Sequence, residues 1–205
     1  LVVLHILALH EVGSNNPDGV EIKKHKDENG IPLDGIKFHP YYSVHDIQGI
    51  AVFLFFFCGI IFFAPEMGGY FLELANFEEA NALKTPAHIA PVWYYTPYYS
   101  VLRAVPDKFW GFVAFAASVA IPFALPWIDR NPVRSWRYRG MLNRVMLLGF
   151  VISFIILGVL GVKAPTESRT LLAQICTIYY FVFFLGMYWW STWDKTKEVP
   201  DRITM

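Results

Sequence analysis

The sequence has no excess charge of either sign and few cysteines. Its 17 lysines and arginines balance 17 aspartates and glutamates, so the formal net charge is zero. A nucleic-acid-binding domain usually has a basic excess, so the balance excludes nucleic acid as a partner. The two cysteines, Cys58 and Cys176, form neither a CxxCH motif for covalent haem attachment nor a disulfide framework.

Charge is also missing from four long apolar stretches, which contain no Asp, Glu, Lys or Arg. They are Ile47–Ala64, Phe109–Trp127, Val145–Val162 and Leu171–Trp193. A hydrocarbon layer about 30 Å thick needs roughly 20 residues of helix, and a helix satisfies its backbone hydrogen bonds internally. The sequence therefore predicts an all-α fold, a polytopic transmembrane bundle that forms a single membrane domain over residues 1–205.

The first residues are apolar but too few to span a membrane. We expect residues 1–12 to be the end of a helix that begins upstream and stops at Gly13, which is followed by an Asn- and Gly-rich turn at 15–19. Basic residues are more frequent in segments 11–46, 128–144 and the C-terminal tail than in the connections between them. The positive-inside rule places these three segments on the cytoplasmic side, and four spans then alternate consistently.

Two histidines near the beginning could perform chemistry. His5 lies in an apolar helix, where an ionisable side chain is costly and often functional, and imidazole can ligate a metal or a haem iron. A buried histidine hydrogen-bonded to a carbonyl is the alternative. His10 lies about 140° around the helix from His5, so the two do not share one ligand-binding face. His10 could transfer protons to a lipid-soluble substrate, or it could be a solvated residue at a helix end.

Two further segments are candidates. Asp46 opens the first long apolar stretch, where it could form a capping box with Ser43 or exchange protons at the lipid boundary. The segment Pro91–Tyr99 is rich in aromatic residues and lies in a long connection, residues 65–108, which we expect to be a loop. Its two prolines disfavour a regular helix. Its rings could line a pocket for a flat ligand, or they could belong to an interfacial aromatic belt.

Taken in order, these motifs resemble cytochrome b, the membrane subunit of the quinol–cytochrome c oxidoreductase (cytochrome bc) complex. They are His5 with His10–Gly19, His39–Tyr42, His45–Gly49, Pro91–Tyr94 and Leu102–Lys108. The resemblance covers essentially the whole chain, and it is specific because several motifs occur in the same order at matching separations. It implies the C-terminal portion of cytochrome b, namely the end of the fourth helix plus helices five to eight.

The resemblance implies roles for residues on the cytoplasmic (or matrix) side. His5 corresponds to an axial iron ligand of the higher-potential b haem, one of two b-type haems in a complete cytochrome b. The second ligand of that iron would come from the second helix. His10, Ser14 and Asp46 correspond to residues around the quinone-reduction site near that haem.

On the opposite side, Pro91, Val92, Trp93 and Tyr94, together with Tyr99, correspond to the quinol-oxidation site. In the family, quinol there gives one electron to a Rieske iron–sulfur protein, and the other crosses through the two haems to reduce quinone. The family motif often reads Pro-Glu-Trp-Tyr, so Val92 replaces a proton-accepting glutamate. His88, Tyr99 or water could take the proton instead.

The implied function is that of a redox subunit in a respiratory or photosynthetic quinol–cytochrome c reductase. The resemblance also implies that the complex translocates protons and that this chain is not active by itself. Implied partners are the N-terminal half of cytochrome b, the Rieske protein, a cytochrome c-type haem subunit and the lipid membrane, in a dimeric complex. The Val20–Phe38 segment is longer than in compact members of the family, and this length favours a bacterial inner membrane over a mitochondrial one. Two alternatives are a haem-free quinone-binding or structural subunit and, less favoured, a transporter domain, which would have charges near mid-membrane.

Overall fold

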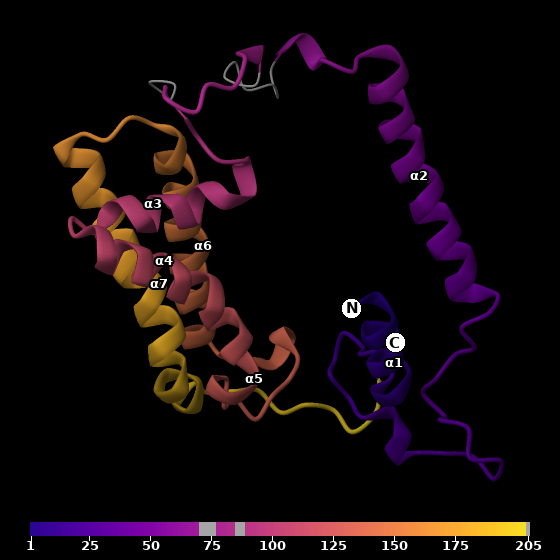
Figure 1. Ribbon diagram of the computed structural model, residues 1–205. Helices are drawn as coiled ribbons and strands as arrows, with labels where there is room; N and C mark the ends of the chain where they lie inside the picture. The colour runs from indigo at the N-terminus through magenta and orange to yellow at the C-terminus, as the bar shows by residue number, and fades with distance from the viewer. Residues whose placement is uncertain (70–76, 85–88, 204–205) are drawn as a thin grey trace. The chain divides into compact units, whose positions relative to one another are not determined.

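The computed structural model describes residues 1–69, 77–84 and 89–203 (Figure 1). Over these residues it contains helices, turns and one isolated bridge between Lys26 and Pro32, and no strand, which confirms the all-α prediction. The α-helices are α1 (Val2–Val12), α2 (Tyr41–Phe63), α3 (Thr96–Ala104), α4 (Lys108–Ala120), α5 (Leu125–Ile128), α6 (Met141–Val162) and α7 (Glu167–Trp193). Short 3-10 helices are η1 (Ile22–Lys24), η2 (Met67–Gly69), η4 (Trp93–Tyr95), η5 (Ile121–Ala124) and η6 (Trp136–Tyr138).

Four helical stretches in the described residues are long and apolar enough to cross a membrane. They are Tyr41–Phe63, Lys108–Ile128, Met141–Val162 and Glu167–Trp193. Each contains most or all of one predicted apolar stretch, and three begin several residues earlier because the polar first turns also adopt helical geometry. The chain is therefore a multi-pass membrane protein.

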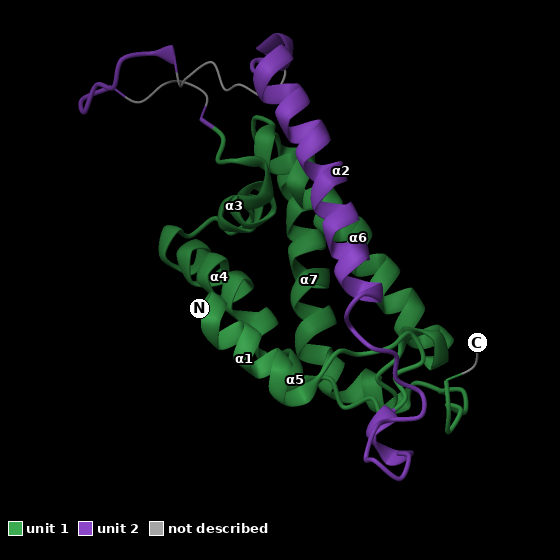
Figure 2. Ribbon diagram, turned by 90° about the vertical axis from the view of Figure 1, so that its right-hand side faces the viewer, with its two compact units in different colours: residues 1–20, 90–205 green, residues 21–89 purple. Residues whose placement is uncertain are grey.

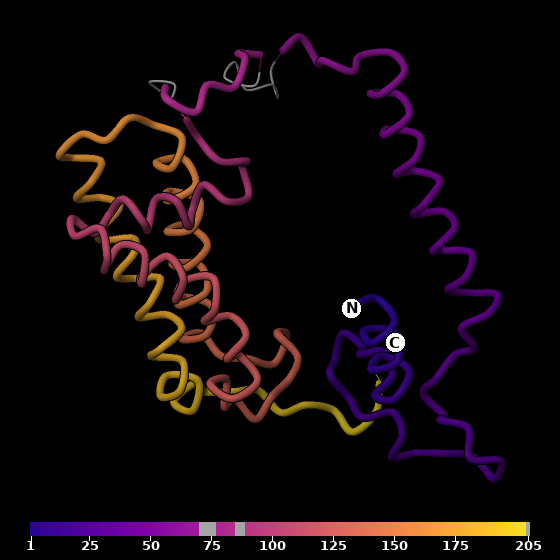
Figure 3. The backbone as a smooth tube through the Cα atoms, viewed as in Figure 1, coloured from indigo at the N-terminus to yellow at the C-terminus, as the bar shows by residue number. Residues whose placement is uncertain are grey.

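The second of these spans is interrupted by proline. Pro122 lacks a backbone N–H, and the helix changes there from α4 through the 3-10 turn η5 into α5. Figure 3 traces the chain through this turn toward α6.

The chain divides into two compact units, coloured separately in Figure 2. One contains residues 1–20 with 90–205, and the other contains residues 21–89. The second unit holds α2, whose residues are not buried. The single membrane domain over residues 1–205 stays a prediction.

In the first unit, α6 and α7 run side by side and α3 lies across their ends, with α4 packed on α3 and near α7 (Figure 1). The core near α3 consists of Val101, Ala104, Leu157, Leu160, Ala173 and Cys176. A second, largely aromatic cluster lies farther along α7 and includes Tyr180, Phe183, Phe184, Met187 and Trp190. The Tyr180 hydroxyl donates to the carbonyl of Ser118 at 2.7 Å, which satisfies a buried polar group and links α7 to α4.

Candidate functional site

The aromatic segment begins as a braced turn. The backbone N–H of Tyr95 donates to the Val92 carbonyl at 2.8 Å, and the Thr96 hydroxyl donates to the Trp93 carbonyl at 2.7 Å. These bonds form η4 and lead directly into α3, whose first turn contains Pro97. Proline is tolerated there because the first helical amides have no intrahelical acceptor. The expectation of a loop over 65–108 is therefore wrong for this part of the connection.

The side chains of this turn present an exposed aromatic surface. Trp93 is 81% exposed, Tyr94 55% and Val92 56%. The rings of Trp93 and Tyr94 meet edge to face with centroids 5.6 Å apart, and those of Tyr94 and Tyr95 are 5.8 Å apart. Such faces and edges can pack against a flat ring, and two of the three rings carry a hydroxyl.

The same segment is anchored in the bundle on its other side. Thr96 and Pro97 are buried, and Thr96 lies against Gly161 of α6. Tyr98 contacts the ring of Phe154 on α6, with centroids 5.8 Å apart, and also the ring of Tyr95. The exposed rings therefore extend from a fixed base rather than from a free loop.

Tyr99 lies under a cation that is itself held in place. The Arg103 guanidinium carbon is 4.9 Å from the centroid of the Tyr99 ring. The Nη2 atom of Arg103 donates to the carbonyls of Leu160 at 2.7 Å and Lys163 at 2.9 Å, at the end of α6. The structure thus brings Pro91, Val92, Trp93, Tyr94 and Tyr99 into one turn–helix segment. His88, the other proton acceptor considered, lies outside the described residues.

His5 and His10 both lie on α1, and both side chains are exposed. Within the described chain the His5 ring has no hydrogen-bond partner, so the alternative of a buried histidine bonded to a carbonyl is not observed. α1 ends at Gly13, which has a positive φ of 79°, as the sequence predicted. The exposed neighbours of His5 on α1 are apolar, including Val2, Leu4 and Leu9. An imidazole without a competing bond on an apolar helix fits a haem ligand.

The turn after α1 is attached to the loop that precedes α6. Asp18 is buried and accepts hydrogen bonds from Arg137 Nη1 at 3.1 Å and from the Tyr138 hydroxyl at 3.0 Å. The Ser135 hydroxyl donates to the Pro17 carbonyl. The exposed Ser14 lies four residues before Asp18. The ion pair between Asp18 and Arg137 therefore fixes the segment that contains Ser14.

Asp46 belongs to the other unit, where it is the sixth residue of α2 and is exposed. The capping box with Ser43, one of the two alternatives for Asp46, is not formed, because the helix begins at Tyr41 and Pro40 occupies the N-cap position. Ser43 is then already inside the first turn, and its hydroxyl pairs with Nδ1 of His39 at 3.1 Å. Asp46 therefore does not take part in a capping box, and proton exchange at the lipid boundary is the role left for it.

Sequence reasoning missed two buried carboxylates. Asp194, just after α7, accepts from the backbone N–H of Gly140 at 2.7 Å and of Asn143 at 3.3 Å, and thereby caps α6 from a distant part of the chain. Nothing in the local sequence of α6 signals this cap. Asp18 could have been found, because it lies in the Asn-rich turn and segment 128–144 is rich in arginine.

Comparison with known proteins identifies a family. The family described as cytochrome b(C-terminal)/b6/petD matches residues 79–181. Cytochrome b of Allochromatium vinosum is 52% identical over 212 residues, which cover 100% of this chain and 51% of that protein. Cytochrome b of Rhodospirillum rubrum is 40% identical over 205 residues, covering 100% of this chain and 48% of the relative.

A solved structure shows the same fold. A chain of a structure titled "Hyperthermophilic respiratory Complex III" aligns with a TM-score of 0.80 and 38% identity. The alignment covers 93% of this chain and 46% of that chain. The chain therefore spans about half the length of the curated relatives and of the structural neighbour it matches.

Proposed function

Because this chain belongs to the cytochrome b(C-terminal)/b6/petD family, we propose that it contributes the C-terminal helices of the membrane redox subunit of a quinol–cytochrome c oxidoreductase. In that role it carries electrons from quinol through b haems to quinone and couples this transfer to proton translocation. The observation that carries the proposal is the anchored aromatic turn of η4 and α3, which joins all five proposed quinol-oxidation residues on one support. The similarity to a respiratory Complex III chain supports it.

The quinol-oxidation site is proposed at Pro91, Val92, Trp93, Tyr94 and Tyr99. The exposed rings of Trp93 and Tyr94 would hold the flat quinol ring by stacking and edge contacts. Tyr99 is oriented by Arg103 and would supply its hydroxyl as a hydrogen-bond partner. Val92 is exposed but has no proton-accepting atom, so a proton from quinol would leave through Tyr99, His88 or water rather than through position 92.

The opposite site is proposed to reduce quinone near a haem. His5 would ligate the iron through a ring nitrogen, and the bound haem would supply one-electron transfer. His10, Ser14 and Asp46 would surround the quinone headgroup, where imidazole and carboxylate groups can deliver protons. Their exposure on α1, the following turn and α2 leaves them accessible to a ligand or a partner.

The remaining half of the subunit and its partners are part of the proposal. They are an N-terminal half of cytochrome b with the second set of haem ligands, a Rieske iron–sulfur protein and a cytochrome c-type haem subunit, assembled as a dimer. The unburied apolar surface of α1 supports a requirement for partner helices, because apolar side chains there, among them Leu4 and Leu7, are largely exposed. A bacterial inner membrane is the proposed location.

The test is quinol-dependent reduction of cytochrome c by membranes that contain or lack this chain. We expect the activity to disappear when the chain is deleted and to return when the gene is restored. Undiminished activity in the deletion strain would contradict the proposal. A haem-free quinone-binding or structural subunit remains the alternative, and it differs in predicting that b-haem content does not depend on His5.

A further inference from the structure

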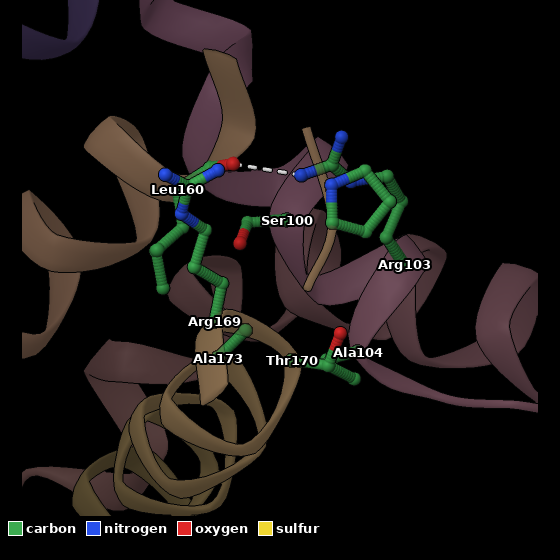
Figure 4. Close-up of a pocket in the computed structure, with 8 residues that line it drawn as sticks. Ser100, Arg103, Ala104, Leu160, Arg169, Thr170 and Ala173 are labelled. Carbon is green, nitrogen blue, oxygen red and sulfur yellow. Dashed lines mark hydrogen bonds between the residues drawn. The ribbon is translucent and has the colours of Figure 1, made fainter. Parts of the chain in front are cut away.

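Two polar atoms on α3 are buried without a hydrogen-bond partner in the described chain. They are Oγ of Ser100 and Nε of Arg103. Ser100 is only 1% exposed. Both residues line one small pocket, which is also bordered by Leu160 at the end of α6 and by Arg169 and Thr170 in the first turns of α7 (Figure 4).

We propose that this pocket binds one ordered water molecule, which accepts a hydrogen bond from the Nε–H of Arg103 and pairs with the hydroxyl of Ser100. The guanidinium Nε–H can only donate, whereas the serine hydroxyl can donate or accept. A water oxygen within reach of both atoms would satisfy the two groups at once. The inference depends only on the packing of α3, α6 and α7, and it goes beyond the proposed function.

The size of the pocket fits one water molecule. Its cavity volume is about 10 Å³. This is the space that one water molecule needs.

The lining of the pocket indicates that it is not dry. Cavities that stay empty are lined by apolar side chains alone. Here half of the lining residues are polar or charged, namely Ser100, Arg103, Arg169 and Thr170, and the others are Ala104, Leu160, Pro165 and Ala173. No acidic residue is among those that line it in the described chain. No carboxylate of the lining therefore competes for the Nε–H of Arg103.

The water completes the fixation of Arg103. Nη2 of this side chain already bonds to the carbonyls of Leu160 and Lys163. The water would hold Nε as well, so that the guanidinium plane is fixed over the Tyr99 ring, 4.9 Å from its centroid. The backbone of α3 is also held from α7, since Nε2 of Gln174 donates to the Ala104 carbonyl at 2.9 Å.

Thr177 provides a matched control. Its Oγ1 atom is also buried without a partner in the described chain, and Thr177 is 7% exposed. It lines an open and otherwise apolar groove between α4 and α7, bordered by Ala114, Ile178 and Phe181. Such a groove gives a water too few polar partners, so we expect no ordered water at Thr177.

The test is a structure of the intact complex at a resolution that shows waters, together with the variants Ser100→Ala and Thr177→Ala. We expect one water peak within hydrogen-bond distance of both Ser100 Oγ and Arg103 Nε. Ser100→Ala should remove the peak and lower the unfolding midpoint by about 2–4 °C, whereas Thr177→Ala should leave the midpoint unchanged or higher. An empty pocket, another occupant in the wild type, or an unchanged midpoint for Ser100→Ala would overturn the inference.

Discussion

Gly161 of α6 lies directly against the backbone carbonyl of Thr96, so closely that a Cβ atom at position 161 would overlap that carbonyl and the Thr96 side chain. The contact joins the last turn of α6 to the beginning of α3, where the exposed aromatic turn is anchored. The lack of a side chain at position 161 therefore determines where Trp93, Tyr94 and Tyr99 can lie.

Gly161→Ala should displace the aromatic turn and reduce quinol oxidation. Because the overlapping atoms are backbone rather than the end of a flexible side chain, we expect a destabilisation of about 1–3 kcal/mol. Gly158→Ala on the same helix is the control, since its Cβ would meet Pro97 Cγ at 3.6 Å and Thr96 Oγ1 at 3.7 Å, which are ordinary contacts. The control should be neutral or stabilise by up to about 1 kcal/mol. Equal unfolding midpoints and rates for the two variants would contradict this role for Gly161.

Val92→Glu should change the pH dependence of quinol oxidation. Val92 is 56% exposed, so a glutamate fits without burial and adds a proton acceptor next to Trp93. A carboxylate accepts a proton only when it is ionised, so the acid side of the rate profile should move toward about pH 4–5, where glutamate titrates. Val92→Gln has the same size but no titratable group and should keep the wild-type profile. An unaltered profile for Val92→Glu would exclude position 92 from the proton route.

Asp46→Asn should slow the reoxidation of haem by quinone. Asp46 does not cap α2, because this helix begins at Tyr41, five residues before Asp46. If Asp46 delivers protons to quinone, loss of the carboxylate should slow reoxidation by at least about tenfold. Glu66→Gln removes an exposed carboxylate just beyond the opposite end of α2 and should have no effect. Normal kinetics in Asp46→Asn with haem retained would argue against the proton-delivery role.

Asp194→Ala should destabilise α6 without altering the proposed sites. The carboxylate accepts from the backbone N–H groups of Gly140 and Asn143 and from Nδ2 of Asn131 at 3.2 Å. Leaving these donors unpaired should cost about 1–3 kcal/mol, measured as a lower thermal unfolding midpoint of the complex. The exposed Asp201 is the control, and Asp201→Ala should leave the midpoint unchanged. A midpoint for Asp194→Ala equal to that of the control would show that the cap is dispensable.

The spans could be predicted from the sequence because the absence of charge over 18 or more residues has one main physical explanation, a helix in lipid. Their ends could not be predicted as well. The first turns of α2 and α7 are polar, and α2 begins at Tyr41, where Pro40 supplies the N-cap. Helix α3 could not be predicted, because proline usually breaks a helix, whereas Pro97 lies in the first turn, where proline is compatible with helical geometry.

The candidate site was predictable only in part. The aromatic composition of Pro91–Tyr99 was visible in the sequence, but the anchoring of this segment was not. It depends on Arg103 of α3 and on Phe154 and Gly161 of α6. The bonds of Asp18 to Arg137 and Tyr138 join parts of the chain separated by 119 and 120 residues. Such pairings have no local signature, because the fold as a whole brings the partners together.

The account depends most on His5 as a haem ligand, and an optical spectrum tests this directly. The reduced-minus-oxidised difference spectrum of the intact complex should be recorded for the wild type, for His5→Ala and for the control His10→Ala on the same helix. We predict that His5→Ala loses about half of the b-haem absorbance, since one of two haems would lack a ligand, while His10→Ala retains it. A full b-haem signal in a correctly assembled His5→Ala complex would contradict the account.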